Sequence, residues 1–176
     1  MDLYVIRHAD AGDREKWTGD DVARPLTDLG RRQARALGEA FRRQGIALGA
    51  VVTSPFTRTW QTAGEFREAA VPEGNEPEVC ELLAAGALKR RKLTKYLAAR
   101  GASSLAVVGH DPDLPKYLAW LVNVEPPQIH LEKGGAALVR FKSEPGKGLG
   151  HLAWLVTPDW FMPTGDAGEP AATDEA

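Results

Sequence analysis

Short apolar runs recur along the chain and predict five β-strands. Each run is rich in Val, Leu, Ile or Ala and is bounded by polar or turn-forming residues, as strands in the interior of a sheet are. The runs occupy residues 3–6, 50–54, 104–109, 136–141 and 151–156. The last two runs are joined by KSEPGKGLG, whose turn-forming residues predict a hairpin.

Between the strands, apolar residues recur at the spacing of amphipathic helices. In the clearest case, Ala34, Leu37, Gly38 and Phe41 share one face, and arginines occupy much of the rest of the segment. Thr27 stands just before this helix and is of a residue type favoured at helix N-caps. Three further helices are predicted at residues 54–66, 88–101 and 111–122.

A polar residue followed by proline indicates where two of these helices begin. Ser54 is expected to be an N-cap, with Pro55 at the first helical position. Asp111 is expected to cap the last helix, with Pro112 following it. Pro115 falls in the first turns of that helix, where the backbone N–H groups have no intrahelical partners to lose.

Strands that alternate with helices predict an α/β fold around a mostly parallel sheet. The terminal hairpin adds an antiparallel pair, so the sheet is expected to be mixed. A chain of 176 residues suits one domain, which we expect to cover residues 1–162. Residues 163–176 are acidic and short of large apolar side chains, and they are predicted to be a disordered tail.

The composition limits which partners and which cellular compartment we expect. A formal net charge of −2 provides no overall field for binding nucleic acid or an anionic membrane. The single cysteine, Cys80, excludes an internal disulfide and a multi-cysteine zinc site, and it suits a reducing compartment. No signal-peptide pattern and no apolar run of about 18 residues is present. We therefore expect a cytoplasmic protein.

Four basic residues stand where predicted strands meet the segments that follow them. Arg7 and His8 follow the first strand, Arg58 lies just after the second, and His110 follows the third. Because parallel strands end at one edge of a sheet, these side chains are expected to be neighbours. Arg58 would oppose the dipole of the helix it begins, a penalty that a bound anion would reverse. Together they predict a cradle for a phosphoryl group.

Other interpretations of these residues remain open at this point. Taken singly, each has an ordinary structural role available, such as a surface ion pair or a buried histidine. A metal site is also conceivable, although two adjacent arginines would repel a cation; its ligands would be His8, Asp10, Asp13 and His110. A thiolate phosphatase is disfavoured, because position 86, six after Cys80, is Gly86 and not arginine.

Four motifs in order resemble the histidine phosphatase superfamily, and more closely its SixA-type phosphohistidine phosphatases: RHADA, RPLTDLGRRQA, SPFTRTWQTA and VVGHDP. The resemblance implies a three-layer α/β/α sandwich around a mixed central sheet. It implies that His8 is the nucleophile, that Arg7, Arg58 and His110 bind phosphate, and that no metal or organic cofactor is needed. Ala9, where the superfamily commonly has glycine, agrees with the SixA type.

Many superfamily members also use an acidic proton donor between the second and third motifs. Glu81 is the candidate by position, and an ordinary surface carboxylate is an equal alternative. A departing histidine nitrogen needs less assistance than a sugar alkoxide, so SixA-type proteins can do without a strong acid.

The expected chemistry follows from a neutral imidazole. The neighbouring arginines would lower the pKa of His8, and one ring nitrogen would donate to a backbone carbonyl while the other faces phosphorus. His110, if protonated, would be a further donor to the transition state. We expect hydrolysis of phosphohistidine on proteins through phospho-His8. The alternatives are a phosphatase for a small phosphorylated metabolite, such as a sugar phosphate or nucleotide, and a noncatalytic phosphate-binding module. The basic run KRRKLTK (89–95) either contacts an acidic partner protein or forms a solvated helix face.

Overall fold

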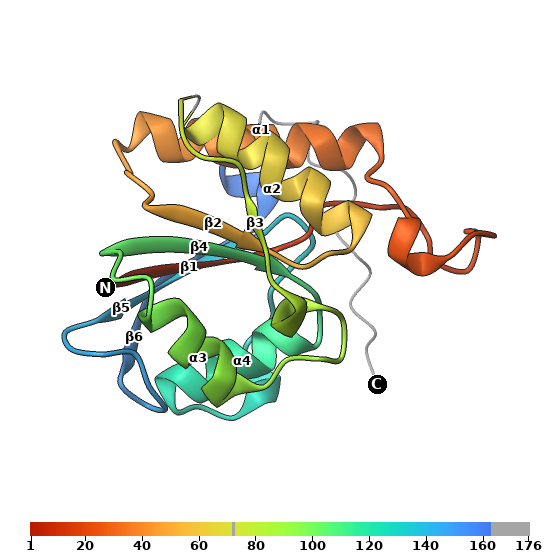
Figure 1. Ribbon diagram of the computed structural model, residues 1–176. Helices are drawn as coiled ribbons and strands as arrows, with labels where there is room; N and C mark the ends of the chain where they lie inside the picture. The colour runs from red at the N-terminus through yellow and green to blue at the C-terminus, as the bar shows by residue number, and fades with distance from the viewer. Residues whose placement is uncertain (72, 163–176) are drawn as a thin grey trace.

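In the computed structural model, which describes residues 1–71 and 73–162, a six-stranded sheet lies between two layers of helices (Figure 1). The strands are β1 (Asp2–Arg7), β2 (Ala50–Thr53), β3 (Glu78–Val79), β4 (Ser104–Gly109), β5 (Ala136–Phe141) and β6 (Gly150–Val156). The helices are α1 (Asp28–Arg43), α2 (Thr57–Ala70), α3 (Arg90–Ala98) and α4 (Asp113–Val122). Short 3-10 turns are η1 (Asp21–Ala23), η2 (Glu81–Leu83), η3 (Pro126–Gln128) and η4 (Pro158–Trp160).

The sheet is mixed, as predicted. Its strand order is β3-β2-β4-β1-β5-β6. β1, β2, β3 and β4 run parallel, whereas β5 is antiparallel to β1 and forms the predicted hairpin with β6. All five predicted strands are present. β3 was not predicted, because two exposed residues are too few to show a periodic pattern.

Both faces of the sheet are covered, which explains why β1 is an uninterrupted apolar run. Successive side chains of a strand point to opposite faces. Leu3 and Val5 pack in a core shared with α3 and α4, and Tyr4 and Ile6 pack in a core shared with α1 and α2. Figure 1 shows α1 and α2 above the sheet and α3 and α4 below it. The three-layer α/β/α prediction is confirmed.

One helix start was predicted correctly. Thr27 caps α1, and its hydroxyl oxygen accepts the N–H of Gly30 at 3.1 Å. No helix in the described part of the chain is long and apolar enough to cross a membrane. The single-domain assignment of residues 1–162 stays a prediction, and the predicted acidic tail, residues 163–176, lies outside the described residues.

Two predicted helix starts were wrong, and for related reasons. α2 begins at Thr57 with Phe56 as its N-cap; the Ser54 hydroxyl accepts the N–H of Phe56 at 3.3 Å and lies 2.8 Å from a ring nitrogen of His110. α4 begins at Asp113, and the Asp111 carboxylate lies 3.8 Å from the guanidinium of Arg7. Each polar side chain that local chemistry favours as a cap is used in a contact between distant segments.

A close approach of α1 and α2 depends on Gly38. A Cβ at this position would lie 2.7 Å from the Cβ of Ala69 and closer still to the carbonyl oxygen of Phe66. Since a backbone carbonyl cannot rotate away, Gly38→Ala is expected to lower the free energy of unfolding by about 1–3 kcal/mol in urea titrations. Gly64→Ala is the matched control, because a Cβ there meets no atom within 4 Å. That variant should be neutral, or more stable by up to about 1 kcal/mol; equal effects at both positions would contradict the packing argument.

Candidate active site

The end of β1 is held in place by backbone hydrogen bonds on both sides. The N–H of Arg7 donates to the Gly135 carbonyl at 3.1 Å, and the N–H of His8 donates to the Gly109 carbonyl at 2.9 Å. The His8 carbonyl in turn accepts the Gly134 N–H at 3.1 Å. Arg7 and His8 therefore leave the sheet at a position set by both neighbouring strands.

The imidazole of His8 has one defined tautomer. Its Nδ1 lies 2.8 Å from the carbonyl oxygen of Ala9, and a carbonyl can only accept, so Nδ1 carries the hydrogen and Nε2 carries a free lone pair. Ala9 is itself held in place, because its N–H donates to the hydroxyl of Thr62 at 3.1 Å and the N–H of the next residue, Asp10, donates to the Gln33 side chain at 2.9 Å. That hydroxyl donates to the Arg58 carbonyl at 2.7 Å, which ties the peptide beside His8 to α2.

Burial keeps His8 neutral. Desolvation lowers the pKa of His8 from 6.5 to about 3, although the hydrogen bond to Ala9 opposes the shift. A proton on His110 and the charges of Arg58 and Arg7 act in the same direction as desolvation, and about 3 is the net result of all these causes. The predicted direction is therefore confirmed, but the larger cause is the loss of water around the ring, and the arginines contribute less.

Arg58 contacts both His110 and Asp21, a third residue that lies beside it. The Arg58 guanidinium donates to the Asp21 carbonyl at 2.7 Å and to its carboxylate at 3.1 Å. It also lies 3.4 Å from Nδ1 of His110. Since a guanidinium cannot accept, this nitrogen of His110 is the acceptor, and its Nε2 donates to the Ser54 hydroxyl at 2.8 Å.

His110 is neutral in this arrangement. Desolvation, followed by the charge of Arg58, lowers its pKa from 6.5 to about 3. Its one N–H is directed at Ser54 and not at the cleft. The expectation of a protonated His110 as a phosphate donor does not describe the free protein, because the ring is both buried and next to a guanidinium.

Two buried guanidinium N–H groups lack a partner. Arg7 donates one terminal N–H to the Leu131 carbonyl at 2.9 Å, and Arg58 uses its terminal groups as described above. Among the described residues, nothing accepts from the Nε of either side chain. Buried donors without acceptors are costly, so a ligand with several acceptor oxygens would be favoured here.

These side chains line a cleft of about 600 Å³ at the carboxyl end of the parallel strands. The cleft contains four of the five predicted site residues: Arg7, His8, Arg58 and His110. The rings of His8 and His110 are 5.4 Å apart. Glu81, the fifth, is exposed at the start of η2 and is not among the described residues that line the cleft. From the segment after β3, it is Ala85 that reaches it.

Asp10, one of the residues considered as metal ligands, has other partners. The Asp10 carboxylate accepts from the hydroxyl of Thr27 at 2.7 Å and from the ammonium of Lys133 at 3.3 Å. Within residues 1–71 and 73–162, no group of three or more His, Cys, Asp or Glu side chains is arranged to hold a metal ion.

Comparisons with known proteins agree with this geometry. The model of the histidine phosphatase superfamily (branch 1) matches residues 3–92, about half of the chain. The chain belongs to this superfamily. It is 26% identical over 161 residues to the phosphohistidine phosphatase SixA of Escherichia coli (strain K12), and the match covers 90% of this chain and 94% of SixA.

Solved histidine phosphatases have the same fold. The structure of the protein histidine phosphatase SixA complexed with tungstate superposes with a TM-score of 0.80 at 25% identity, covering 92% of this chain and all of that one. An alpha-ribazole phosphatase from Shigella flexneri superposes with a TM-score of 0.63 at 14% identity, over 84% of this chain and 94% of that chain. The second similarity concerns the fold alone.

In this histidine phosphatase superfamily member, Arg24 and Asp21 also line the cleft, and neither was predicted as a site residue. Arg24, which begins the RPLT motif, is buried; its Nε donates to the Asp21 carboxylate at 2.9 Å and a terminal N–H donates to the Ala11 carbonyl at 2.8 Å. Burial would raise the pKa of Asp21, but the bond from Arg24 and the charge of Arg58 lower it overall. The signal for Arg24 was its place at the start of the RPLTDLGRRQA motif, whereas Asp21 lies in a segment without periodicity.

The neutral state of both histidines can be tested by pH titration. Ring resonances of His8 and His110 in NMR spectra are expected to stay in the neutral form from pH 8 to about pH 5, because the folded pKa values of about 3 lie below 6.5. The unfolded chain binds more protons than the folded one in this interval, so these two groups stabilise the fold fully above pH 6.5. Their contribution is lost as the pH falls towards 3. A His8 ring that titrates near pH 6.5 would contradict the assignment.

Proposed function

We propose that this protein is a phosphatase that hydrolyses phosphohistidine on other proteins through a phosphoryl group carried transiently on Nε2 of His8. One observation carries the proposal. The bond from Nδ1 to the Ala9 carbonyl and a pKa of about 3 leave Nε2 with a free lone pair, beside two guanidinium groups that each have an unsatisfied buried donor.

In the first step, the lone pair of His8 Nε2 forms a bond to phosphorus. The bond from phosphorus to the nitrogen of the substrate breaks, and its electron pair goes to that nitrogen. If the other nitrogen of the substrate ring is protonated, imidazole leaves as a neutral molecule and no strong acid is required. This substrate therefore suits a cleft that Glu81 does not line.

In the second step, water attacks phosphorus from the side opposite His8. The bond from phosphorus to Nε2 breaks, the electron pair returns to Nε2, and the proton of the water is released to solvent or to the phosphate. The guanidinium groups of Arg7 and Arg58 stabilise the charge on the nonbridging oxygens in both steps. A bound phosphoryl dianion would also raise the pKa of His110, and the protonated ring would then be a third donor.

The relatives support a phosphoryl substrate carried by a protein. SixA of Escherichia coli (strain K12) is a phosphohistidine phosphatase, and the SixA structure contains tungstate, a tetrahedral oxyanion like phosphate. A second candidate is a phosphatase for a small phosphorylated metabolite. A cleft of about 600 Å³ would hold such a molecule. The intact nucleophile at His8 disfavours a noncatalytic phosphate-binding module.

The deciding experiment compares a histidine-phosphorylated protein with a panel of sugar phosphates and nucleotides. We expect kcat/KM for the phosphohistidine protein to be higher by roughly 100-fold or more. The opposite ranking would favour the small-molecule activity, and phosphate binding without turnover of any substrate would favour the noncatalytic module. EDTA should leave the rate unchanged, because the proposed steps use side chains of this chain alone.

A further inference from the structure

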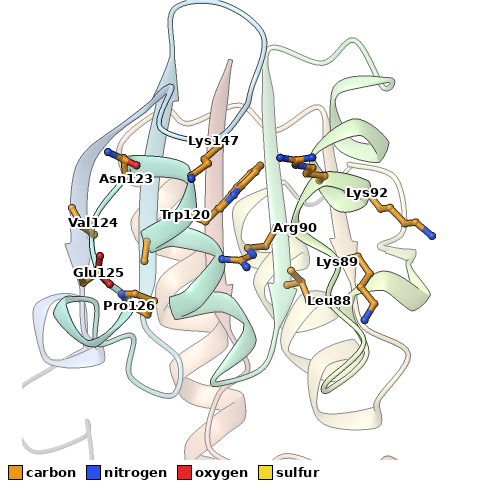
Figure 2. A pocket seen from close by; sticks show the side chains of 12 residues that line it. Leu88, Lys89, Arg90, Lys92, Trp120, Asn123, Val124, Glu125, Pro126 and Lys147 are labelled. Carbon is orange, nitrogen blue, oxygen red and sulfur yellow. The ribbon is translucent and has the colours of Figure 1, made fainter.

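A second cavity, of about 760 Å³, lies between α3 and α4 and is separate from the catalytic cleft (Figure 2). We call it the basic groove. It is lined by five cations, Lys89, Arg90, Arg91, Lys92 and Lys147, and by one acid, Glu125. In Figure 2, Arg90 extends from α3 towards the side where Trp120 of α4 lies, whereas Lys89 and Lys92 point outwards.

The cations of the basic groove are unpaired. Within the described part of the chain, none of the five forms an ion pair, and none of their side chains takes part in a hydrogen bond. By contrast, Arg31 and Arg35 on α1 share Glu65 at 2.8 and 2.5 Å. Unpaired charges of one sign that line the same groove repel one another, so this cluster would be stabilised by an external anion.

α3 carries three of these cations and has a fourth, Lys89, as its N-cap, and this position adds to the repulsion. α3 begins at Arg90, its N-cap Lys89 makes no side-chain capping bond, and its first turn contains no acid. Cations at a helix N-terminus oppose the helix dipole, and the first N–H groups of the helix have no intrahelical acceptor. An acidic partner would offset the unfavourable interaction of these cations with the helix dipole, and it would supply acceptors for the first N–H groups of α3.

The basic groove adjoins the catalytic cleft. Ala85 lines the cleft and Leu88 lines the groove, so at most about 11 Å of extended chain separates them. A protein docked with its phosphorylated residue in the cleft covers about 800 Å² of this surface, a disc of about 16 Å radius. Such a partner would lie across the groove, whereas a small metabolite held in the cleft would not reach it.

We propose that the basic groove docks an acidic surface of the protein that carries the phosphohistidine, so that charge outside the cleft selects the substrate protein. The inference rests on the proposed function and deepens it. A protein surface fits better than a small anion, because Lys89, Arg90, Arg91 and Lys92 are all exposed and spread over a helix end. Trp120 and the exposed side chain of Val124 add apolar contact area.

The test is the triple variant R90Q/R91Q/K92Q, assayed with an acidic histidine-phosphorylated carrier protein and with phosphoramidate. With the carrier protein at low salt, kcat/KM is expected to fall by roughly tenfold, mainly through KM. With phosphoramidate it should stay within twofold of the unmodified protein. The difference should vanish in about 1 M salt, where the Debye length is about 3 Å.

The matched control removes three exposed cations from α1, on the opposite layer of the sheet: R32Q/R42Q/R43Q. It should turn over both substrates at the rate of the unmodified protein. Equal loss with both substrates in R90Q/R91Q/K92Q, or no loss with either, would overturn the docking inference. So would tight binding of ATP that this variant loses while its turnover of the carrier protein is unchanged.

A binding measurement separates this inference from the proposed function. Calorimetric titration with the unphosphorylated acidic carrier requires no catalysis, and R90Q/R91Q/K92Q should weaken its binding by roughly tenfold relative to R32Q/R42Q/R43Q. If the unmodified protein binds the carrier through the groove but does not hydrolyse its phosphohistidine, the proposed function fails and the docking surface remains. Equal binding by both variants overturns the docking surface alone.

Discussion

Replacing His8 with alanine is expected to lower kcat/KM for phosphohistidine by roughly 10⁴-fold or more, because the lone pair that attacks phosphorus is lost. The same change should abolish covalent labelling. Brief exposure of the unmodified protein to radiolabelled substrate, followed by an alkaline quench, should trap acid-labile phosphate on His8. His8→Ala should carry no such label after the same treatment.

The fold should survive this change. His8 is a small part of the buried core, and its removal takes a desolvated imidazole away from Arg7 and Arg58. Circular dichroism and the midpoint of urea unfolding should therefore be close to those of the unmodified protein. His151→Ala, which removes an exposed histidine from β6, is the control and should keep full activity and full labelling. Activity that persists in His8→Ala would show that another group is the nucleophile.

Removing the Arg58 guanidinium should have the second largest effect. Arg58→Ala is expected to lower kcat by roughly 10²–10³-fold, about 2.7–4 kcal/mol of transition-state stabilisation. The reason is geometric as well as electrostatic. Arg58 is buried, contacts His110 and has an unpartnered Nε, so it can donate to phosphoryl oxygens from a fixed position.

Two further variants make the Arg58 result specific. Arg58→Lys keeps the charge but loses the planar fork, and it should recover only part of the rate. Arg67→Ala removes an arginine from the same helix that pairs with Glu76 at 2.7 Å and does not line the cleft, and its activity should be unchanged. If Arg58→Ala retains kcat within threefold of the unmodified protein, the guanidinium does not stabilise the transition state.

The parts of the fold that depend on local pattern were predictable. The strands were found because a sheet covered on both faces needs apolar residues at every position, as Leu3 and Tyr4 show on opposite sides of β1. α1 was found because the apolar period and the cap at Thr27 agree. The edge on which Arg7, His8, Arg58 and His110 meet followed from parallel strands alone.

The parts of the fold that depend on contacts between distant segments were not predictable from the sequence. Ser54 and Asp111 have the local chemistry of caps, but contacts with His110 and Arg7 decide their conformations. Asp21 begins the short turn η1, in a segment without periodicity, and it is held by Arg58, far along the chain. The role of Glu81 as proton donor stays a prediction, and its exposure outside the cleft lining gives it no support.

The backbone of His8 is hydrogen-bonded to Gly109 on one side and to Gly134 on the other, directly after β1, a strand in the interior of the sheet. Local fluctuations that open loops and edges leave such a segment closed, and its amides exchange with solvent only when the whole domain unfolds. The amide of His8 should be among the slowest to exchange deuterium. On heating, the nucleophile should lose its position in the same cooperative transition that melts the sheet, without an earlier, folded but inactive form.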